Sequence, residues 1–371
     1  MKPWGVYIHV PYCSAICPYC DFNVYRLKKN TDWDGLKRAY LQEIKLRIKD
    51  EGLDLSNLVS IYFGGGTPSL APVGLLKACI DALQPAQHVE ITLEADPQTF
   101  TQERVDAWYS MGMRRLSTGW QSTHPEILKK LGRLHRAEQA WDALAMARAA
   151  GFTNINVDLI FAVPGQTEEH LAVDLERMVQ AKPQHISIYA LTYHTGTPFD
   201  RWRASGKLRQ TPEETELAMM RQIQTALRAS DFEHYEVSNY AQPGMRSQHN
   251  QMYWRGATVL GIGPGAHGLM NYGDHARRWE NHRDVAHYIS AWTKDAMFSV
   301  AWEEDLDAQK MLIERIACGV RQKDGFALSP HLDCQIAALC AQGLMFIEGG
   351  RVCPTDRGME IADLLASTLC C

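Results

Sequence analysis

The regular alternation of strand-like and helix-like segments through residue 238 is the feature that most constrains the fold of this chain. The strand-like runs are β-branched, aromatic and apolar on both faces, and most of the intervals carry helical periodicity. Such an alternation predicts an α/β fold in which helices cover a parallel sheet. The number of units exceeds a small flavodoxin-like sheet, so we expect a partial or full (β/α) barrel. The predicted strands are 4–10, 58–63, 89–95, 114–119, 154–161, 184–191 and 233–238, and the predicted helices are 34–50, 70–83, 101–111, 136–150, 167–181 and 212–231.

The pattern changes after residue 238. The next sixty residues are rich in Gly, His, Asn, Tyr and Trp and show weak periodicity, which is typical of a connecting or functional segment. Further on, short helical stretches lead to a predicted hairpin at 344–353, with Gly349-Gly350 as its turn. The expected units are therefore a barrel over 1–238, a connecting segment over 239–300 and a small α+β domain of winged-helix type over 301–371.

Charge and hydropathy narrow the class of protein. The 371 residues include 38 Lys+Arg and 43 Asp+Glu, a net charge of −5 that argues against nucleic-acid binding through a broad basic face. No apolar run approaches the ~20 residues of a membrane span, and the start of the chain shows no signal-peptide cleavage pattern. We expect a cytoplasmic protein that touches membranes only peripherally, if at all. No interface pattern distinguishes a monomer from a dimer.

Three cysteines in a Cys-x3-Cys-x2-Cys pattern follow the first predicted strand directly: Cys13, Cys17 and Cys20. Without an export signal they are expected to stay reduced. Three thiolates on one short loop can bind a single metal centre, and on a four-iron cubane they leave one iron open for another ligand. A zinc ion with His9 as fourth ligand is the alternative, and coincidental buried thiols are a third interpretation.

Polar residues and glycines occur at the ends of successive predicted strands. Active sites of parallel α/β barrels form at the carboxyl ends of the strands, so these residues are expected to meet there. Each one alone has an ordinary structural explanation, but together with the cysteine loop after the first strand they follow five strands in a row, which predicts a binding site. The residues are Gly64-Gly65-Gly66-Thr67-Pro68 after the second strand, Glu94 and Gln121 at the ends of the third and fourth, Arg133 one short helix later, and Asp158 in the fifth.

These motifs together resemble a known family. The cysteine loop, with Tyr19 before its last cysteine, and the GGGTP run are similar to those of radical S-adenosylmethionine enzymes. Over about residues 4–270 the chain resembles the branch shared by oxygen-independent coproporphyrinogen III oxidase and the haem chaperones of the HemW type. The matching segments are YIHVPYC (7–13), YFGGGTPS (62–69), LEADP (93–97), LGRLH (131–135), DLIFAVPGQT (158–167) and YEVSNYAQPG (235–244).

The resemblance implies a pair of cofactors. Cys13, Cys17 and Cys20 would bind a [4Fe-4S] cluster, and S-adenosylmethionine would chelate its open iron. Two positions depart from the family. Thr123 stands where an aromatic residue is usual, and Trp120 replaces a small aliphatic residue and is expected to place a large ring beside the cofactor pocket. By resemblance, the S-adenosylmethionine site would comprise Tyr7, Tyr19, Gly65, Gly66, Thr67, Glu94, Gln121, Arg133 and Asp158.

Two features favour the chaperone side of this branch. The oxidase has a further cysteine two residues after its third ligand and a long extension before the first, whereas here Asp21-Phe22 follow Cys20. In addition, residues 249–254 match the HNxxYW motif of the haem chaperones. His249 offers an imidazole as axial iron ligand, and Tyr253 and Trp254 offer flat surfaces for a porphyrin. The alternative is that His249 caps a turn and the aromatic residues belong to the core.

The resemblance therefore implies a haem chaperone without coproporphyrinogen oxidase activity. It would bind haem, transfer it to an acceptor haem protein such as a respiratory one, and receive electrons for its cluster from a flavodoxin-like reductant. The main alternative is a radical enzyme that decarboxylates coproporphyrinogen oxidatively, and a weaker one is a tetrapyrrole methyltransferase or haem-opening enzyme. His267, in the run GPGAHG, is interpreted as a turn histidine.

Overall fold

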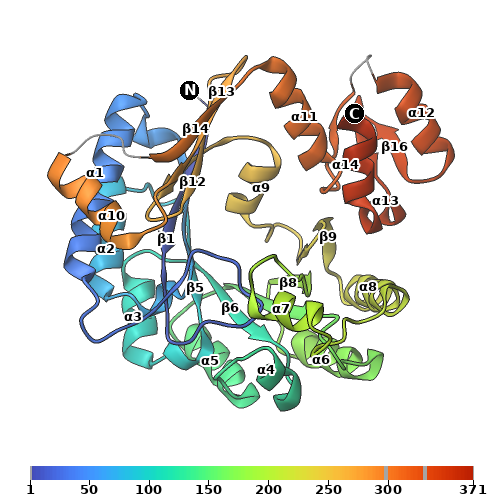
Figure 1. Ribbon diagram of the computed structural model, residues 1–371, viewed down its shortest axis with the longest axis horizontal. Coiled ribbons are helices and arrows are strands. Elements are labelled where there is room, and N and C mark those ends of the chain that lie inside the picture. Colours follow the sequence, from blue (N-terminus) through green and yellow to red (C-terminus); the bar gives the residue numbers. More distant parts are fainter. Residues whose placement is uncertain (1, 296–299, 329–331, 371) are drawn as a thin grey trace.

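The computed structural model describes residues 2–295, 300–328 and 332–370. A twelve-stranded sheet with helices on its outer side forms most of the molecule, and a smaller unit with a three-stranded sheet lies beside it (Figure 1). Among the described residues, no helix combines the length and apolar character that crossing a bilayer requires.

The large sheet has the strand order β14-β13-β12-β11-β1-β4-β5-β6-β7-β8-β10-β9. The seven strands from β11 to β8 run parallel, and antiparallel strands extend both edges. Within the described residues β14 and β9 end the sheet, so the barrel is partial. The strands are β1 (Trp4–Val10), β4 (Leu58–Gly65), β5 (Glu90–Ala95), β6 (Arg115–Gln121), β7 (Asn154–Phe161), β8 (His185–Ala190), β9 (Glu233–Glu236), β10 (Asn239–Ala241), β11 (Thr258–Ile262), β12 (His267–Asn271), β13 (Ala276–Asn281) and β14 (Val300–Leu306).

Helices between successive strands cover the outer face of the sheet, as the alternation predicts (Figure 1). One short helix, α9, lies on the inner side and contacts β1, β4 and β11. Two very short strands, β2 (Tyr12–Cys13) and β3 (Tyr25–Arg26), pair at the base of the cysteine loop. The helices are α1 (Trp33–Asp50), α2 (Val73–Leu83), α3 (Gln102–Ser110), α4 (Pro125–Lys130), α5 (Ala137–Ala149), α6 (Glu168–Gln180), α7 (Pro198–Ala204), α8 (Glu213–Arg228), α9 (Gln248–Trp254) and α10 (Val285–Ser290).

Residues 239–300 do more than connect two units. They contribute β10 to one edge of the large sheet and β11, β12 and β13 to the other, and β11 pairs in parallel with β1. All five residues of β11 are buried, but the run is short and stands among glycines and polar residues. Its periodicity is therefore too weak to reveal a strand that only pairing with β1 stabilises.

The last part of the chain has its own small core. The predicted hairpin forms from β16 (Met345–Glu348) and β17 (Arg351–Pro354), and Gly349 and Gly350 at its turn have φ angles of 55° and 75°. An ion pair between Arg221 of α8 and Glu360, 3.0 Å apart, links this unit to the barrel. The remaining elements are α11 (Ala308–Gly319), β15 (Phe326–Ala327), α12 (Asp333–Ala341), α13 (Asp356–Glu360) and α14 (Ala362–Cys370).

A buried polar network joins α1 to the edge strands. Glu43 accepts a hydrogen bond from Arg47 Nε at 2.9 Å and another from the Tyr288 hydroxyl at 2.6 Å. Asn281 of β13 contacts both charged partners, since its Nδ2 donates to Glu43 at 2.8 Å and its Oδ1 accepts from Arg47 at 3.0 Å. Both charges are fully surrounded by partners, so the loss of one leaves the other without compensation in a low-dielectric interior.

We expect Glu43→Gln to lower the free energy of unfolding by about 3 kcal/mol, because it leaves the Arg47 charge buried and uncompensated. Asp81→Asn is the matched control: it removes another i,i+4 helical ion pair, with Lys77, in which both side chains are 59% exposed. The control should change stability little. Urea denaturation of the variants measures both effects, and equal losses would contradict the role of this network.

Candidate cofactor site

The carboxyl ends of the parallel strands open into a cavity of about 400 Å³. The cysteine loop forms one wall, and the ends of β4 to β8 form most of the rest. The structure thereby brings together residues that are separated by well over one hundred positions in the chain. The predicted residues that line this cavity are Cys13, Cys17, Tyr19, Cys20, Gly65, Gly66, Thr67, Glu94, Gln121, Arg133 and Asp158.

Two residues that the sequence suggested as ligands, Tyr7 and His9, are not among the described residues that line the cavity. The hydroxyl of Tyr7, predicted for the S-adenosylmethionine site, bonds to His9 Nδ1 at 3.0 Å. His9 Nε2 bonds to the Asn23 carbonyl oxygen at 2.9 Å, so both ring nitrogens are engaged. In this arrangement neither ring nitrogen has a free lone pair, which disfavours His9 as the fourth ligand of a zinc site.

The glycine run after β4 docks directly on the cysteine loop. The Gly66 and Thr67 amides donate to the carbonyl oxygens of Val10 and Tyr12, each at 2.8 Å. A Cβ atom on Gly66 would lie 2.8 Å from the Tyr12 carbonyl oxygen and 3.0 Å from Cys13 Sγ. This approach is too close for a side chain, and the φ angle of 109° at Gly65 also requires glycine.

The thiols of the loop suit a soft metal centre. Burial raises the pKa of the Cys13 thiol and raises that of Cys20 to about 12, so both are neutral at pH 7 without a metal. A metal centre binds the thiolate form and releases these protons. Arg133 Nη1 lies 3.8 Å from Cys17 Sγ and provides a positive charge beside the sulfur. Three thiols of one loop that line the same cavity fit a [4Fe-4S] cluster better than a hard cation.

Several polar side chains that line the cavity have hydrogen-bonding atoms available for a ligand. Glu94 accepts hydrogen bonds from the Tyr62 hydroxyl at 2.8 Å and from the Gly65 amide at 3.2 Å. Gln121 Oε1 and Arg133 Nε are buried without a hydrogen-bond partner among the described residues. Gln121 also has a φ angle of 64°, which is uncommon for a residue with a side chain. These unsatisfied groups fit a polar cofactor such as S-adenosylmethionine.

Sequence reasoning missed several residues of this cavity. Asp96 forms an ion pair with Arg133 at 2.7 Å, and it follows Glu94 by two positions in the LEADP motif. Asn156 precedes Asp158 by two positions in β7 and donates to its carboxylate at 2.6 Å. Since alternate residues of a strand share a face, period-2 spacing from the predicted residues was the signal that could have found both. Other lining residues are Tyr62, Arg115, Tyr189 and Asn250.

The expectation that Trp120 crowds the cofactor pocket is wrong. Its side chain is fully buried on the opposite face of the sheet, where its ring centroid lies 5.2 Å from that of Trp141 of α5. Gly119 and Gln121 on either side of it line the cavity. The alternation of side chains along β6 therefore directs the indole into the outer helical layer.

The HNxxYW motif forms α9, and its histidine is enclosed. His249 is 1% exposed, with Nδ1 2.9 Å from the Ser60 hydroxyl and Nε2 3.2 Å from the Tyr253 hydroxyl. Its ring stacks on Tyr62 with a centroid distance of 4.9 Å. Burial lowers the pKa of His249 to about 3, and the positive charge of the nearby Arg115 makes a smaller contribution in the same direction. The imidazole is therefore neutral at pH 7.

Helix α9 lies between two cavities. Asn250 lines the first one, whereas the 44% exposed ring of Tyr253 lines a second cavity of about 260 Å³. His267 also lines this second cavity, and it is the first residue of β12 rather than a turn residue. Trp254 is turned elsewhere, since its side chain hydrogen-bonds to Glu236. Tyr253 and Trp254 thus do not face a common space in this structure.

Comparison with known proteins identifies the family of the chain. Residues 7–178 match the model of the radical SAM superfamily. The proteins named heme chaperone HemW from Lactococcus lactis and Mycobacterium tuberculosis are 31% and 34% identical to it. The alignments cover 98% and 99% of this chain, and 96% and 95% of those proteins. The chain belongs to the HemW family.

This HemW family member shares its fold with a solved oxidase structure. The coproporphyrinogen III oxidase HemN from Escherichia coli, described as a radical SAM enzyme, matches with a TM-score of 0.80 over 99% of this chain and 90% of its own, at 20% identity. This likeness confirms the predicted fold. Membership of the radical SAM superfamily implies a [4Fe-4S] cluster and S-adenosylmethionine, and the three thiols and polar wall described above are compatible with both.

The buried Glu94 carboxyl predicts a pH dependence of stability. Burial raises its pKa from 4.5 to about 7, although the Tyr62 hydrogen bond opposes this shift. Between these two pH values the folded state binds more protons than the unfolded state, so this group makes stability fall as pH rises through the window.

Glu94→Gln should therefore stabilise the protein relative to the wild type by up to about 3 kcal/mol above pH 7 and by little at pH 5. Thermal unfolding from pH 5 to 8, without added S-adenosylmethionine, measures the difference. Taking the variant minus the wild type cancels the contributions of the buried histidines. A difference that does not grow with pH would contradict the raised pKa.

Proposed function

We propose that this chain is a haem chaperone, which binds haem and transfers it to an acceptor haem protein, and that a [4Fe-4S] cluster and S-adenosylmethionine occupy its first cavity. The observation that carries this proposal is the position of α9 between the two cavities. Asn250 of the motif contacts the cofactor cavity while Tyr253 contacts the second one. A change at the cofactors thus has a short structural path to the second cavity.

In the first cavity Cys13, Cys17 and Cys20 would hold the cluster. When bound, a reduced [4Fe-4S] cluster supplies one electron to the sulfonium of S-adenosylmethionine. Arg133 would offset negative charge on the sulfurs, since its guanidinium lies beside Cys17. Glu94 in its charged form would accept hydrogen bonds from the amino or hydroxyl groups of the nucleotide. The neighbouring glycines leave room for that nucleotide to contact the backbone.

Haem binding at His249 would require one defined movement. Nε2 is the ring nitrogen that faces the Tyr253 hydroxyl, so an iron atom reaches it only when this tyrosine swings away. The exposed ring of Tyr253 lies against the second cavity, and its departure would open a path from that cavity to the imidazole. Leu269, Leu306 and Met311 give the cavity apolar walls for a porphyrin. The low pKa of His249 keeps its lone pair available for iron.

The charge of the first cavity disfavours the alternative oxidase. A coproporphyrinogen carries four propionate groups and calls for cationic partners. The cavity instead combines two arginines, Arg115 and Arg133, with four acidic side chains. Arg133 is already paired with Asp96. The acidic residues that line it are Asp21, Glu94, Asp96 and Asp158.

The proposal also includes a cellular compartment and two partner proteins. We place the protein in the cytoplasm, with a flavodoxin-like reductant for its cluster and a haem protein as acceptor.

Haem titration tests the chaperone proposal. Added haem should produce a Soret band in the wild type, and His249→Ala should weaken it because an axial ligand is lost. His287→Ala, at an exposed site on the outer helix α10, is the matched control and should leave the band unchanged. A wild type that ignores haem yet consumes coproporphyrinogen with S-adenosylmethionine would support the oxidase instead.

Metal analysis tests the cluster. Protein reconstituted without oxygen should contain iron and acid-labile sulfide and absorb broadly in the visible range. Replacing Cys13, Cys17 and Cys20 with Ser should abolish both, because hydroxyl groups do not replace thiolates on iron–sulfur clusters. Cys334→Ser, at an exposed cysteine, should retain them. A zinc-containing, colourless wild type would refute the proposed cofactors.

A further inference from the structure

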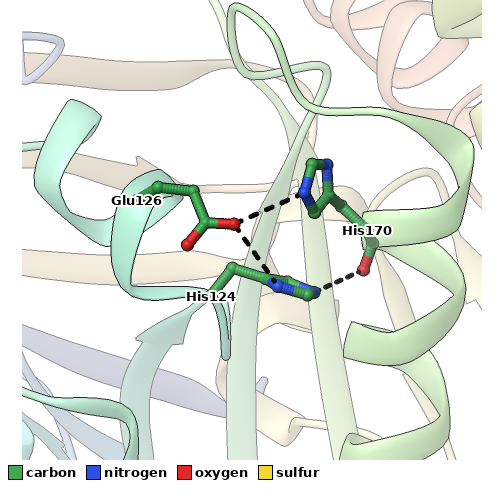
Figure 2. Close-up of side chains that lie close together, drawn as sticks. All are labelled: His124, Glu126 and His170. Atoms are coloured by element: carbon green, nitrogen blue, oxygen red, sulfur yellow. Dashed lines mark hydrogen bonds and ion pairs between the residues drawn. The ribbon is translucent and has the colours of Figure 1, made fainter.

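We propose that His124, Glu126 and His170 form a binding site for a divalent transition-metal ion, separate from the cofactor cavity. His124 precedes α4 as its N-cap residue, Glu126 is in the first turn of α4, and His170 is in the first turn of α6. The three side chains converge from the two helices (Figure 2). None of them lines the first cavity.

The spacing of the ligand atoms fits one ion. Glu126 Oε1 lies 3.7 Å from His124 Nδ1 and 3.4 Å from His170 Nε2, and each of the three residues offers one ligand atom within 4.8 Å of the other two. In a tetrahedral zinc site, bonds of about 2.0–2.1 Å place neighbouring ligand atoms about 3.4 Å apart. Small side-chain rotations therefore suffice to bring the three atoms around a single ion. Two imidazoles and a carboxylate are a donor set that zinc uses in other proteins.

The proton on His124 is positioned as in a metal ligand. Its Nε2 lies 3.1 Å from the His170 carbonyl oxygen, which only accepts hydrogen bonds, so Nε2 carries the proton (Figure 2). The lone pair of Nδ1 then faces a carboxylate oxygen of Glu126, and neither atom has a proton to donate in the neutral imidazole. A cation between them converts this repulsion into two bonds. Metal-binding histidines typically donate their second N–H to such a carbonyl oxygen.

His170 can supply the second nitrogen. Metal binding at Nε2 requires the ring proton on Nδ1, and the Thr167 hydroxyl lies 3.2 Å from Nδ1, where it can accept that proton. The Thr167 amide, which now donates to Nδ1 at 3.1 Å, is exposed and would turn to water. Glu126 is 55% exposed, so water can complete the coordination.

The ion would join two helices that support the cofactor cavity. The loop before α4 is already tied to α6, because the Ser122 hydroxyl and the Thr123 amide donate to Asp174 at 2.8 Å and 2.6 Å. A bound ion adds a second link closer to the surface. Gln121 directly before this loop and Arg133 after α4 both line the first cavity. The site thus acts as a structural clamp on one wall of that cavity.

Zinc uptake by the cluster-reconstituted protein tests this site. After equilibrium dialysis against micromolar Zn²⁺ without oxygen, the wild type should retain one equivalent more than Glu126→Gln and His124→Asn. The matched control is Glu103→Gln, which changes an exposed acidic residue in the first turn of α3 and should bind as the wild type does. Because the readout is a difference, zinc on other cysteines cancels.

Crystals soaked in Zn²⁺ provide a second readout. Anomalous scattering at the zinc edge should show a peak between the two imidazoles and Glu126 in the wild type and none there in Glu126→Gln. Equal zinc content in the wild type and both variants, or zinc bound only elsewhere, would overturn the proposal. Equal unfolding temperatures of all variants in the presence of a chelator would confirm that the substitutions do not simply disrupt the fold. Haem binding is not part of this readout, so either proposal can fail alone.

Discussion

The close approach of the glycine run to the cysteine loop is the contact on which the rest of this structure depends. Parallel pairing of β1 and β4 places Val10 opposite Gly65, so the segments that follow both strands leave the sheet side by side. Two backbone hydrogen bonds then join Gly66 and Thr67 to the loop side of β1. Only glycine permits this contact, because a Cβ on Gly66 would collide with the Tyr12 carbonyl oxygen and crowd Cys13. The contact thereby holds Cys13 at the rim of the cavity, which Cys17 and Cys20 of the same loop also line.

Burial determines the electrostatics of the cavity that this contact creates. The wall combines more carboxyl groups than guanidinium groups, and burial raises the pKa of Glu94 and Asp158. Arg133 is drawn to Asp96 and faces Cys17, which places its charge next to the sulfur loop. A cationic ligand stabilises the charged forms of these carboxyl groups, whereas a polyanion does not, so the site suits a cationic, hydrogen-bond-rich ligand. This preference is consistent with a sulfonium nucleotide and with the HemW family to which the chain belongs.

Helix α9 connects this site to a second, more apolar space. Its histidine is enclosed by Ser60, Tyr62 and Tyr253, so the imidazole is not accessible to a ligand in this structure. Glu90 of β5 caps the N-terminus of this helix, because its carboxylate accepts hydrogen bonds from the amides of Gln248 and His249. A movement of α9 is therefore coupled to the central sheet, and in our proposal this coupling relates the cofactor cavity to haem binding.

The sequence by itself determined the layered α/β architecture, the parallel strands β1 and β4 to β8, and most of the residues that line the cofactor cavity. These features follow from local information: periodicity defines each strand and helix, and parallel strands bring their carboxyl ends to one edge. Tertiary structure alone decided that residues 239–300 complete the sheet, that Trp120 points away from the cavity and that His249 is enclosed. It also brought His124, Glu126 and His170 together from two helices. Each of these outcomes depends on which segment packs against which, and such long-range contacts leave no periodic signal along the chain.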